Sequence, residues 1–78
     1  MNLAMVKKQQ QVRVKKVTDQ YPDDPVAQRL RELGFVDGEP VTVVARGLFG
    51  GNPLVVKVGS TRFALRKLEA ARVEVESC

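Results

Sequence analysis

Residues 41–66, VTVVARGLFGGNPLVVKVGSTRFALR, decide the fold because apolar residues alternate with other residues along three short runs. The runs cover residues 41–46, 54–58 and 61–66, and glycine-containing segments separate them. Alternation with a period of two is typical of strands that bury one face. Gly59-Ser60 has the length and composition of a two-residue hairpin turn. We therefore expect three consecutive antiparallel strands.

A short amphipathic helix is expected just before these strands, over residues 25–33. Asp24 can accept hydrogen bonds from the amides of the first turn, and Pro25 loses no hydrogen bond at the first helical position. Gly34 is expected to end the helix, because glycine readily adopts the left-handed backbone of a helix C-terminus. The predicted apolar face has spacings of four and three residues and consists of Val26, Leu30 and Leu33.

The two ends of the chain are each expected to add a strand. Val12 and Val14 alternate with polar residues, whereas Val17 is out of phase with them, so we expect either a bulge or a strand end near Lys16. Residues 68–72 have the pattern of a single helical turn, and residues 73–76 alternate valine with glutamate, as a short strand does. Residues 1–10 show no sustained periodicity and are expected to form a flexible leader.

The predicted fold class is mostly β, a small SH3-like barrel of about five strands with one short amphipathic helix, because curling removes exposed strand edges. The chain has 78 residues, of which 44% are hydrophobic and 28% charged. These values are typical of an ordinary folded domain. We expect one domain over residues 11–76.

The composition offers no catalytic, cofactor or metal site. The chain has no histidine and a single cysteine, Cys78, so the commonest general base is absent and a thiolate metal site is incomplete. Asp19, Asp23 and Asp24 cluster, but turn and capping roles account for them. Residues 47–52 are glycine-rich but lack the lysine and helix of a phosphate-binding loop. We therefore expect a non-enzyme. We also expect it to be cytoplasmic, because no apolar run could span a membrane and a lone cysteine suits a reducing compartment.

The same loop offers a candidate contact surface for a partner protein. Leu48 and Phe49 stand between glycines at the expected tip of a β connection. Large apolar residues at such a tip either fold inward to enlarge a small core or contact a partner, and the sequence leaves both alternatives open. Arg29, Arg62 and Arg66 are expected to form charged rims that orient the partner.

The alternative function is a small nucleic-acid-binding barrel. The formal net charge is +4, and five cations precede the first acidic residue: Lys7, Lys8, Arg13, Lys15 and Lys16. Such a segment attracts nucleic acid, anionic lipid or an acidic protein face. However, the one tyrosine and three phenylalanines do not alternate with these cations, as a base-stacking surface requires. We therefore expect no nucleic-acid partner.

Four segments in fixed order resemble the FeoA family, the ferrous-iron transport protein A of bacteria. They are RLRELGFVDG at residues 29–38, VTVVAR at residues 41–46, GGNPL at residues 50–54 and FALRKLEAA at residues 63–71. The resemblance implies a cytoplasmic SH3-like domain that assists a membrane ferrous-iron transporter with a GTP-binding domain. The leading hypothesis is a regulatory domain that docks on that GTP-binding domain through Leu48 and Phe49. A homodimer formed through strand edges is a further partner that the sequence allows.

Overall fold

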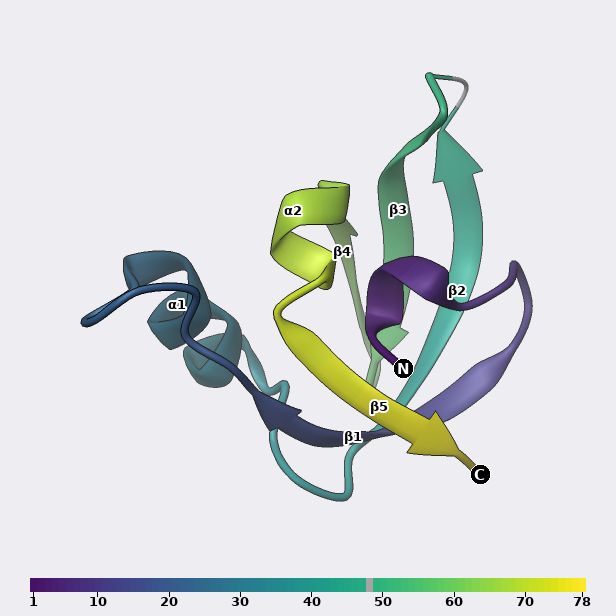
Figure 1. Ribbon diagram of the computed structural model, residues 1–78. Coiled ribbons are helices and arrows are strands. Elements are labelled where there is room, and N and C mark those ends of the chain that lie inside the picture. The colour runs from purple at the N-terminus through teal and green to yellow at the C-terminus, as the bar shows by residue number, and fades with distance from the viewer. Residues whose placement is uncertain (48) are drawn as a thin grey trace.

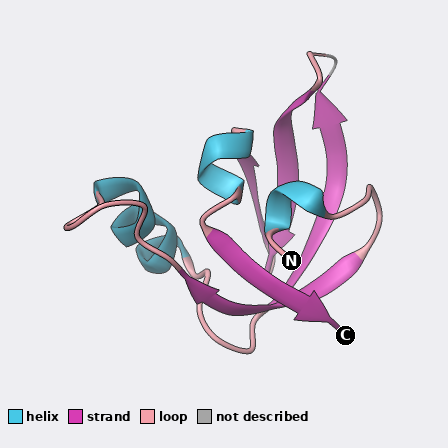
Figure 2. Ribbon diagram, viewed as in Figure 1, coloured by secondary structure: helices cyan, strands magenta, loops and turns pink. Residues whose placement is uncertain are grey.

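The computed structural model describes residues 1–47 and 49–78 and shows a mostly β chain (Figures 1 and 2). Its strands are Gln11–Val17 (β1), Pro40–Gly47 (β2), Gly51–Val58 (β3), Thr61–Leu65 (β4) and Val73–Ser77 (β5). They form one antiparallel sheet in the order β4-β3-β2-β1-β5. The sheet bends, so that the β1–β5 pair crosses the other three strands in Figure 1. The predicted mostly β class with five strands is confirmed.

One face of each strand lines a single apolar core. The predicted alternation is confirmed, since Val41 and Val43 of β2 and Leu54 and Val56 of β3 are fully buried while Lys57 is exposed. Phe35 is also buried, and its ring packs against that of Phe63, with the ring centroids 5.9 Å apart and the planes at 49°. The other buried apolar residues are Leu3, Val6, Val12, Val14, Val17, Ala27, Leu30, Val58, Leu65, Ala70, Val73 and Val75.

Strand β1 contains the predicted irregularity. Its register with β5 shifts between Val14 and Lys16, which is the position expected for the bulge. The extra residue restores the inward direction of Val17, whose side chain is buried. Of the two expected alternatives, a bulge or a strand end, the structure shows the bulge, and β1 continues to Val17.

Helix α1, Pro25–Leu33, begins and ends where the sequence predicts. The Asp24 carboxylate accepts the N–H of Val26 at 3.0 Å and that of Ala27 at 3.4 Å, so it caps the first turn. Gly34 has φ +112° and ends the helix in the left-handed conformation. The N–H of Phe35 then donates to the carbonyl of Leu30 at 3.2 Å. The chain therefore turns back and places Phe35 in the core.

The buried face of α1 differs from the prediction. Ala27 and Leu30 are buried, whereas Val26 and Leu33 are only half-buried. The helix lies to one side of the sheet in Figure 1, and Ala27 and Leu30 are its two residues in the core. Val26 and Leu33 lie at the margins of that contact and face the space between α1 and β4.

Residues 1–10 are not a leader detached from the core, as the sequence suggested. Leu3 and Val6 are fully buried, and a short 3₁₀ helix, η1 (Leu3–Met5), separates them. The segment also adds backbone hydrogen bonds, because the N–H of Val75 donates to the carbonyl of Met1 at 2.9 Å and the N–H of Gln9 donates to that of Val43 at 2.6 Å. The first ten residues therefore cover the outer side of β5 and extend the contact with β2.

The connection between β4 and β5 is a short helix, α2 (Lys67–Ala70), which begins and ends slightly earlier than predicted. It is stabilised at its start by the Glu69 carboxylate, which accepts the N–H of Arg66 at 2.7 Å. Helix α2 corresponds to the helical turn predicted at residues 68–72, and β5 corresponds to the strand predicted at residues 73–76. Over the described parts of the chain, neither α1 nor α2 has the length and apolar character needed to span a bilayer.

Candidate interaction surface

The hairpin of β2 and β3 carries an exposed aromatic side chain at its tip. Phe49 is 86% exposed, so the inward alternative for this residue is wrong. The N–H of Asn52 donates to the carbonyl of Phe49 at 3.1 Å, and Gly50 and Gly51 between them have φ of +64° and +84°. Glycine adopts such angles without strain, so the turn closes tightly. Leu48, the other apolar residue predicted to contact a partner, lies outside the described residues.

The base of this hairpin is held firmly although its tip is exposed. A Cβ atom added to Gly47 would lie 1.9 Å from the carbonyl oxygen of Asn52, so only glycine permits this approach of the two chains. The Asn52 Oδ1 atom accepts the N–H of Lys67 at 2.8 Å and thereby joins β3 to the start of α2. The base of the hairpin that carries Phe49 is therefore fixed relative to the barrel.

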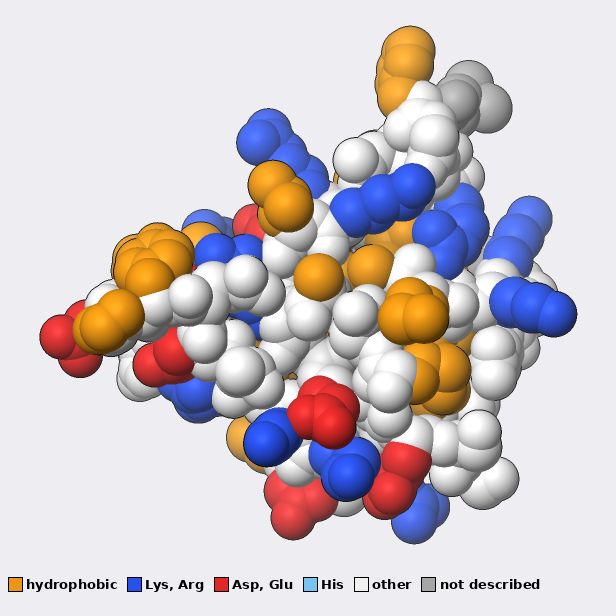
Figure 3. Space-filling model, viewed as in Figure 1, with side chains coloured by type: hydrophobic (Ala, Val, Ile, Leu, Met, Phe, Trp, Pro, Cys, Tyr) orange, Lys and Arg blue, Asp and Glu red, His pale blue; other side chains and the backbone are white. Residues whose placement is uncertain are grey.

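Two cations lie along the inner side of the hairpin. Arg46 donates from Nη2 to the carbonyl of Ala4 at 2.9 Å and also to that of Val6, so it joins β2 to the amino-terminal segment. A Cβ atom placed on Gly51 would lie 3.1 Å from Arg46 Nη1 and 3.5 Å from Lys67 Cε. In Figure 3 a hydrophobic group protrudes at the hairpin tip, and Lys and Arg side chains gather on the same face below it. This surface combines an apolar projection with positive charge.

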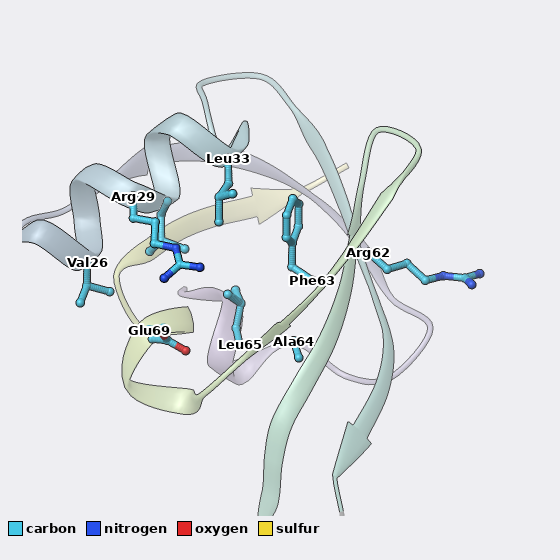
Figure 4. Close-up of a pocket in the computed structure, with 9 residues that line it drawn as sticks. Val26, Arg29, Leu33, Arg62, Phe63, Ala64, Leu65 and Glu69 are labelled. Atoms are coloured by element: carbon cyan, nitrogen blue, oxygen red, sulfur yellow. The ribbon is translucent and has the colours of Figure 1, made fainter.

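A second surface is a groove between α1 and the edge strand β4 (Figure 4). Its volume is about 320 Å³. The side chains of Arg29, Leu33, Phe63, Leu65 and Glu69 point toward this common space, whereas Arg62 points away from it. Sequence reasoning missed the groove, because it placed Leu33 in the core and did not treat Phe63 as a surface residue.

The predicted partner-binding residues therefore do not form one patch. Arg29 lines the groove, and the stem of Arg62 borders it while its guanidinium group extends outward. Arg66 is exposed at the junction of β4 and α2. Phe49 does not line the groove and lies at the tip of the other hairpin. The structure thus separates an aromatic tip from an arginine-bordered groove.

Asp24 is the one charged side chain that is fully buried among the described residues. Burial by itself would raise the pKa of its carboxyl group, but hydrogen bonds from Arg72 and from the backbone N–H groups of Gln20, Ala27 and Val26 outweigh this effect and lower the pKa from 3.8 to about 2. The Arg72 Nε atom donates to Asp24 Oδ2 at 2.7 Å. Asp24 therefore joins α1 to the segment before β5 and is committed to structure.

Some of the remaining charged candidates also have protein partners. Asp19 accepts a hydrogen bond from Arg31 at 2.8 Å, and within residues 1–47 and 49–78 no three acidic or cysteine side chains are grouped as metal ligands. In the basic amino-terminal strand, Lys16 lies 3.8 Å from Glu74. Arg13 is opposite Glu76 in the register of β1 and β5. Acidic residues of β5 thus offset part of the positive charge of β1.

Comparison with known proteins identifies one family model, described as the FeoA domain, which matches residues 1–77. Among solved structures, the chain is similar to a FeoA from Stenotrophomonas maltophilia, described as a procaryotic SH3 domain protein in complex with zinc. The identity is 51%, the TM-score is 0.92, and the match covers 97% of this chain and 89% of that one. The fold is accordingly SH3-like. A comparison with curated protein sequences found no match.

Two further solved structures extend the comparison. The iron(II) transport protein A from Clostridium thermocellum is 31% identical with a TM-score of 0.84, over 99% of this chain and 45% of that one. A manganese-dependent transcriptional repressor has the same TM-score, 0.84, but is 19% identical, and the match covers 100% of this chain and 41% of the repressor. The latter likeness shows the shared fold alone.

Proposed function

Because the chain belongs to the FeoA domain family, whose members are small SH3-like accessory proteins rather than enzymes, we propose that it regulates bacterial ferrous-iron uptake in the cytoplasm. Its partner in this role is the GTP-binding domain of the membrane ferrous-iron transporter. The Stenotrophomonas relative is described as possibly acting as a ferrous iron transport activating factor, which supports the same assignment here.

The observation that carries this proposal is the exposure of Phe49 on a hairpin whose base is fixed. Large aromatic side chains in the centre of a contact dominate the free energy of binding in many interfaces. An aromatic side chain that is 86% exposed gains most of its apolar burial only when a partner covers it. Since the hairpin base is fixed by Gly47 and Asn52, docking needs little ordering of the backbone at that base.

The positive charge below the tip indicates the character of the partner surface. Arg46 and Lys67 lie beside the loop, and the whole chain has a net charge of +4. Charges at the rim of an interface mainly raise the association rate and fix orientation. An acidic face on the GTP-binding domain, with a hollow for Phe49, fits both features.

The test compares binding of the full chain and of a double variant, Leu48→Ser with Phe49→Ser, to the purified GTP-binding domain by calorimetry. We expect the double variant to bind at least about thirtyfold more weakly, which corresponds to about 2 kcal/mol for an aromatic anchor. Tyr21→Ser is the matched control, because Tyr21 is an exposed aromatic residue before α1. It should bind like the parent chain.

The same samples should be used to measure the rate of GTP hydrolysis with and without the chain. We expect the parent and Tyr21→Ser chains to change that rate and the double variant to leave it unchanged. If a folded double variant still binds as the parent does, the hairpin tip is not the docking surface.

A further inference from the structure

We propose that the groove between α1 and β4 binds an extended acidic segment of a partner protein, which adds to β4 as a further strand and places an apolar side chain between the two elements. The proposal concerns a different surface from the hairpin tip, so it does not depend on the proposed contact of Phe49.

The first support is the unpaired edge of β4. Strand β4 is the last strand on its side of the sheet and pairs with β3 alone. Among residues 1–47 and 49–78, no backbone or side-chain group outside β3 forms a hydrogen bond with the backbone of residues 61–65. The opposite edge differs, since Met1 and Asn2 cover part of β5. Unpaired edges are the sites where extended peptides add to a sheet.

The second support is the chemistry of the groove beside this edge. Leu30, Leu33, Phe63 and Leu65 supply an apolar floor and wall from both elements. Its volume of about 320 Å³ lies at the small end of the range for ligand sites, so it suits one or two side chains rather than a cofactor. A strand laid on β4 directs alternate side chains to one face, and those side chains would enter the groove.

The third support is the charge around the groove. Arg29 points into it, Arg62 borders it and Arg66 lies at the end of β4, whereas among the described residues Glu69 is the only acidic one that lines it. The Glu69 carboxylate already accepts the N–H of Arg66. The three arginines still outnumber this carboxylate, so the local field is positive and favours a segment that carries acidic residues next to its apolar side chain.

This charge also argues against a second copy of the chain as the occupant. Two β4 strands paired edge to edge would bring the arginines of one copy near those of the other. Like charges in such a position are destabilising. An acidic peptide meets the same arginines with opposite charge.

The experiment selects binders to the full chain from a phage-displayed library of random dodecapeptides and then synthesises the enriched sequences. We expect enriched peptides that combine acidic and large apolar residues. Amide hydrogen exchange of the chain, followed by NMR with and without peptide, should slow in β4. A peptide that is N-methylated at alternate positions should not bind, because it cannot pair with the strand edge.

Charge-reversal variants provide the matched control. Arg29→Glu should weaken binding of the selected peptide by about tenfold or more, whereas Lys8→Glu, an equal change of charge at an exposed site outside the groove, should alter it by less than about twofold. The Leu48 and Phe49 double variant should bind the peptide like the parent, so the result is independent of the hairpin tip.

The proposal is overturned if the selected peptides leave exchange in β4 unchanged, if they lack acidic residues, or if no sequence is enriched. It is also overturned if β4 becomes protected without peptide as the protein concentration rises, since a second copy is then the occupant. Failure of peptide binding alongside intact docking through Phe49 would remove this inference and leave the proposed function standing.

Discussion

Replacing Leu3 with alanine tests whether the amino-terminal segment is part of the fold. Leu3 is fully buried although it lies in a segment whose sequence has no strand or helix periodicity. Its 3₁₀ helix packs against α2 and β5. The side chain therefore closes one end of the core, and its truncation leaves a cavity there.

The magnitude follows from the burial of this side chain. Truncation of a buried leucine to alanine costs about 2–5 kcal/mol, depending on how far the surroundings collapse. Since η1 is a short element at one end of the core, partial collapse is expected, and we predict a loss of about 2–3.5 kcal/mol in the free energy of unfolding. For a chain of 78 residues the whole free energy of unfolding is about 4–12 kcal/mol, so this loss is a large part of it. The melting temperature should fall by about 10–25 °C.

Urea unfolding followed by circular dichroism, together with calorimetry, measures both quantities. Met5→Ala is the control, because Met5 belongs to the same short helix but is 66% exposed. It should change the free energy of unfolding by less than about 0.5 kcal/mol. Equal, small effects of the two substitutions would refute the burial of the segment.

Three further outcomes follow from the structure. The pKa of Asp24 is about 2 in the folded chain and 3.8 in the reference state, so its carboxylate stabilises the fold above about pH 4, and this contribution is lost as the pH falls toward 2. In urea unfolding, Asp24→Asn should therefore be less stable than the parent at pH 7, and the difference in free energy of unfolding should shrink near pH 2. The control Asp23→Asn, at an exposed site, should be as stable as the parent at both pH values. Gly47→Ala should lower stability by about 1–3 kcal/mol and change the NMR shifts of the hairpin, because the added Cβ meets the Asn52 backbone; unchanged shifts would contradict the close approach. Double-stranded DNA should show no measurable binding even at low salt, and binding that collapses at moderate salt would revive the nucleic-acid alternative.

Local patterns in the sequence predicted the elements whose partners are close along the chain. The hairpin turn at Gly59 and the cap and end of α1 depend on neighbouring residues, so they could be predicted from the sequence. An irregularity near Lys16 of β1 was predictable because Val17 is out of phase with Val12 and Val14, although the sequence did not decide between a bulge and a strand end. In each case one short stretch contains the whole signal.

Other features depend on contacts between distant residues and could not be predicted. Arg46 bonds to the carbonyl of Ala4, 42 positions away, and this contact helps to hold a segment that has no periodicity of its own. Arg72 pairs with Asp24 across 48 positions. The groove arises from the angle at which α1 meets β4, which is a property of tertiary packing. The sequence identified Phe49 as a candidate contact but could not decide between its inward and outward directions.

The most direct test of the central claim is photo-crosslinking from position 49 in membranes that contain the ferrous-iron transporter. Phe49 is replaced by a benzophenone-bearing phenylalanine, and Tyr21 is replaced in the same way as the control, since it is exposed before α1. We predict that position 49 forms an adduct that mass spectrometry maps to the GTP-binding domain and that position 21 does not. An adduct from position 21 alone, or none from position 49 under conditions where the two proteins bind, would contradict an outward-facing docking tip.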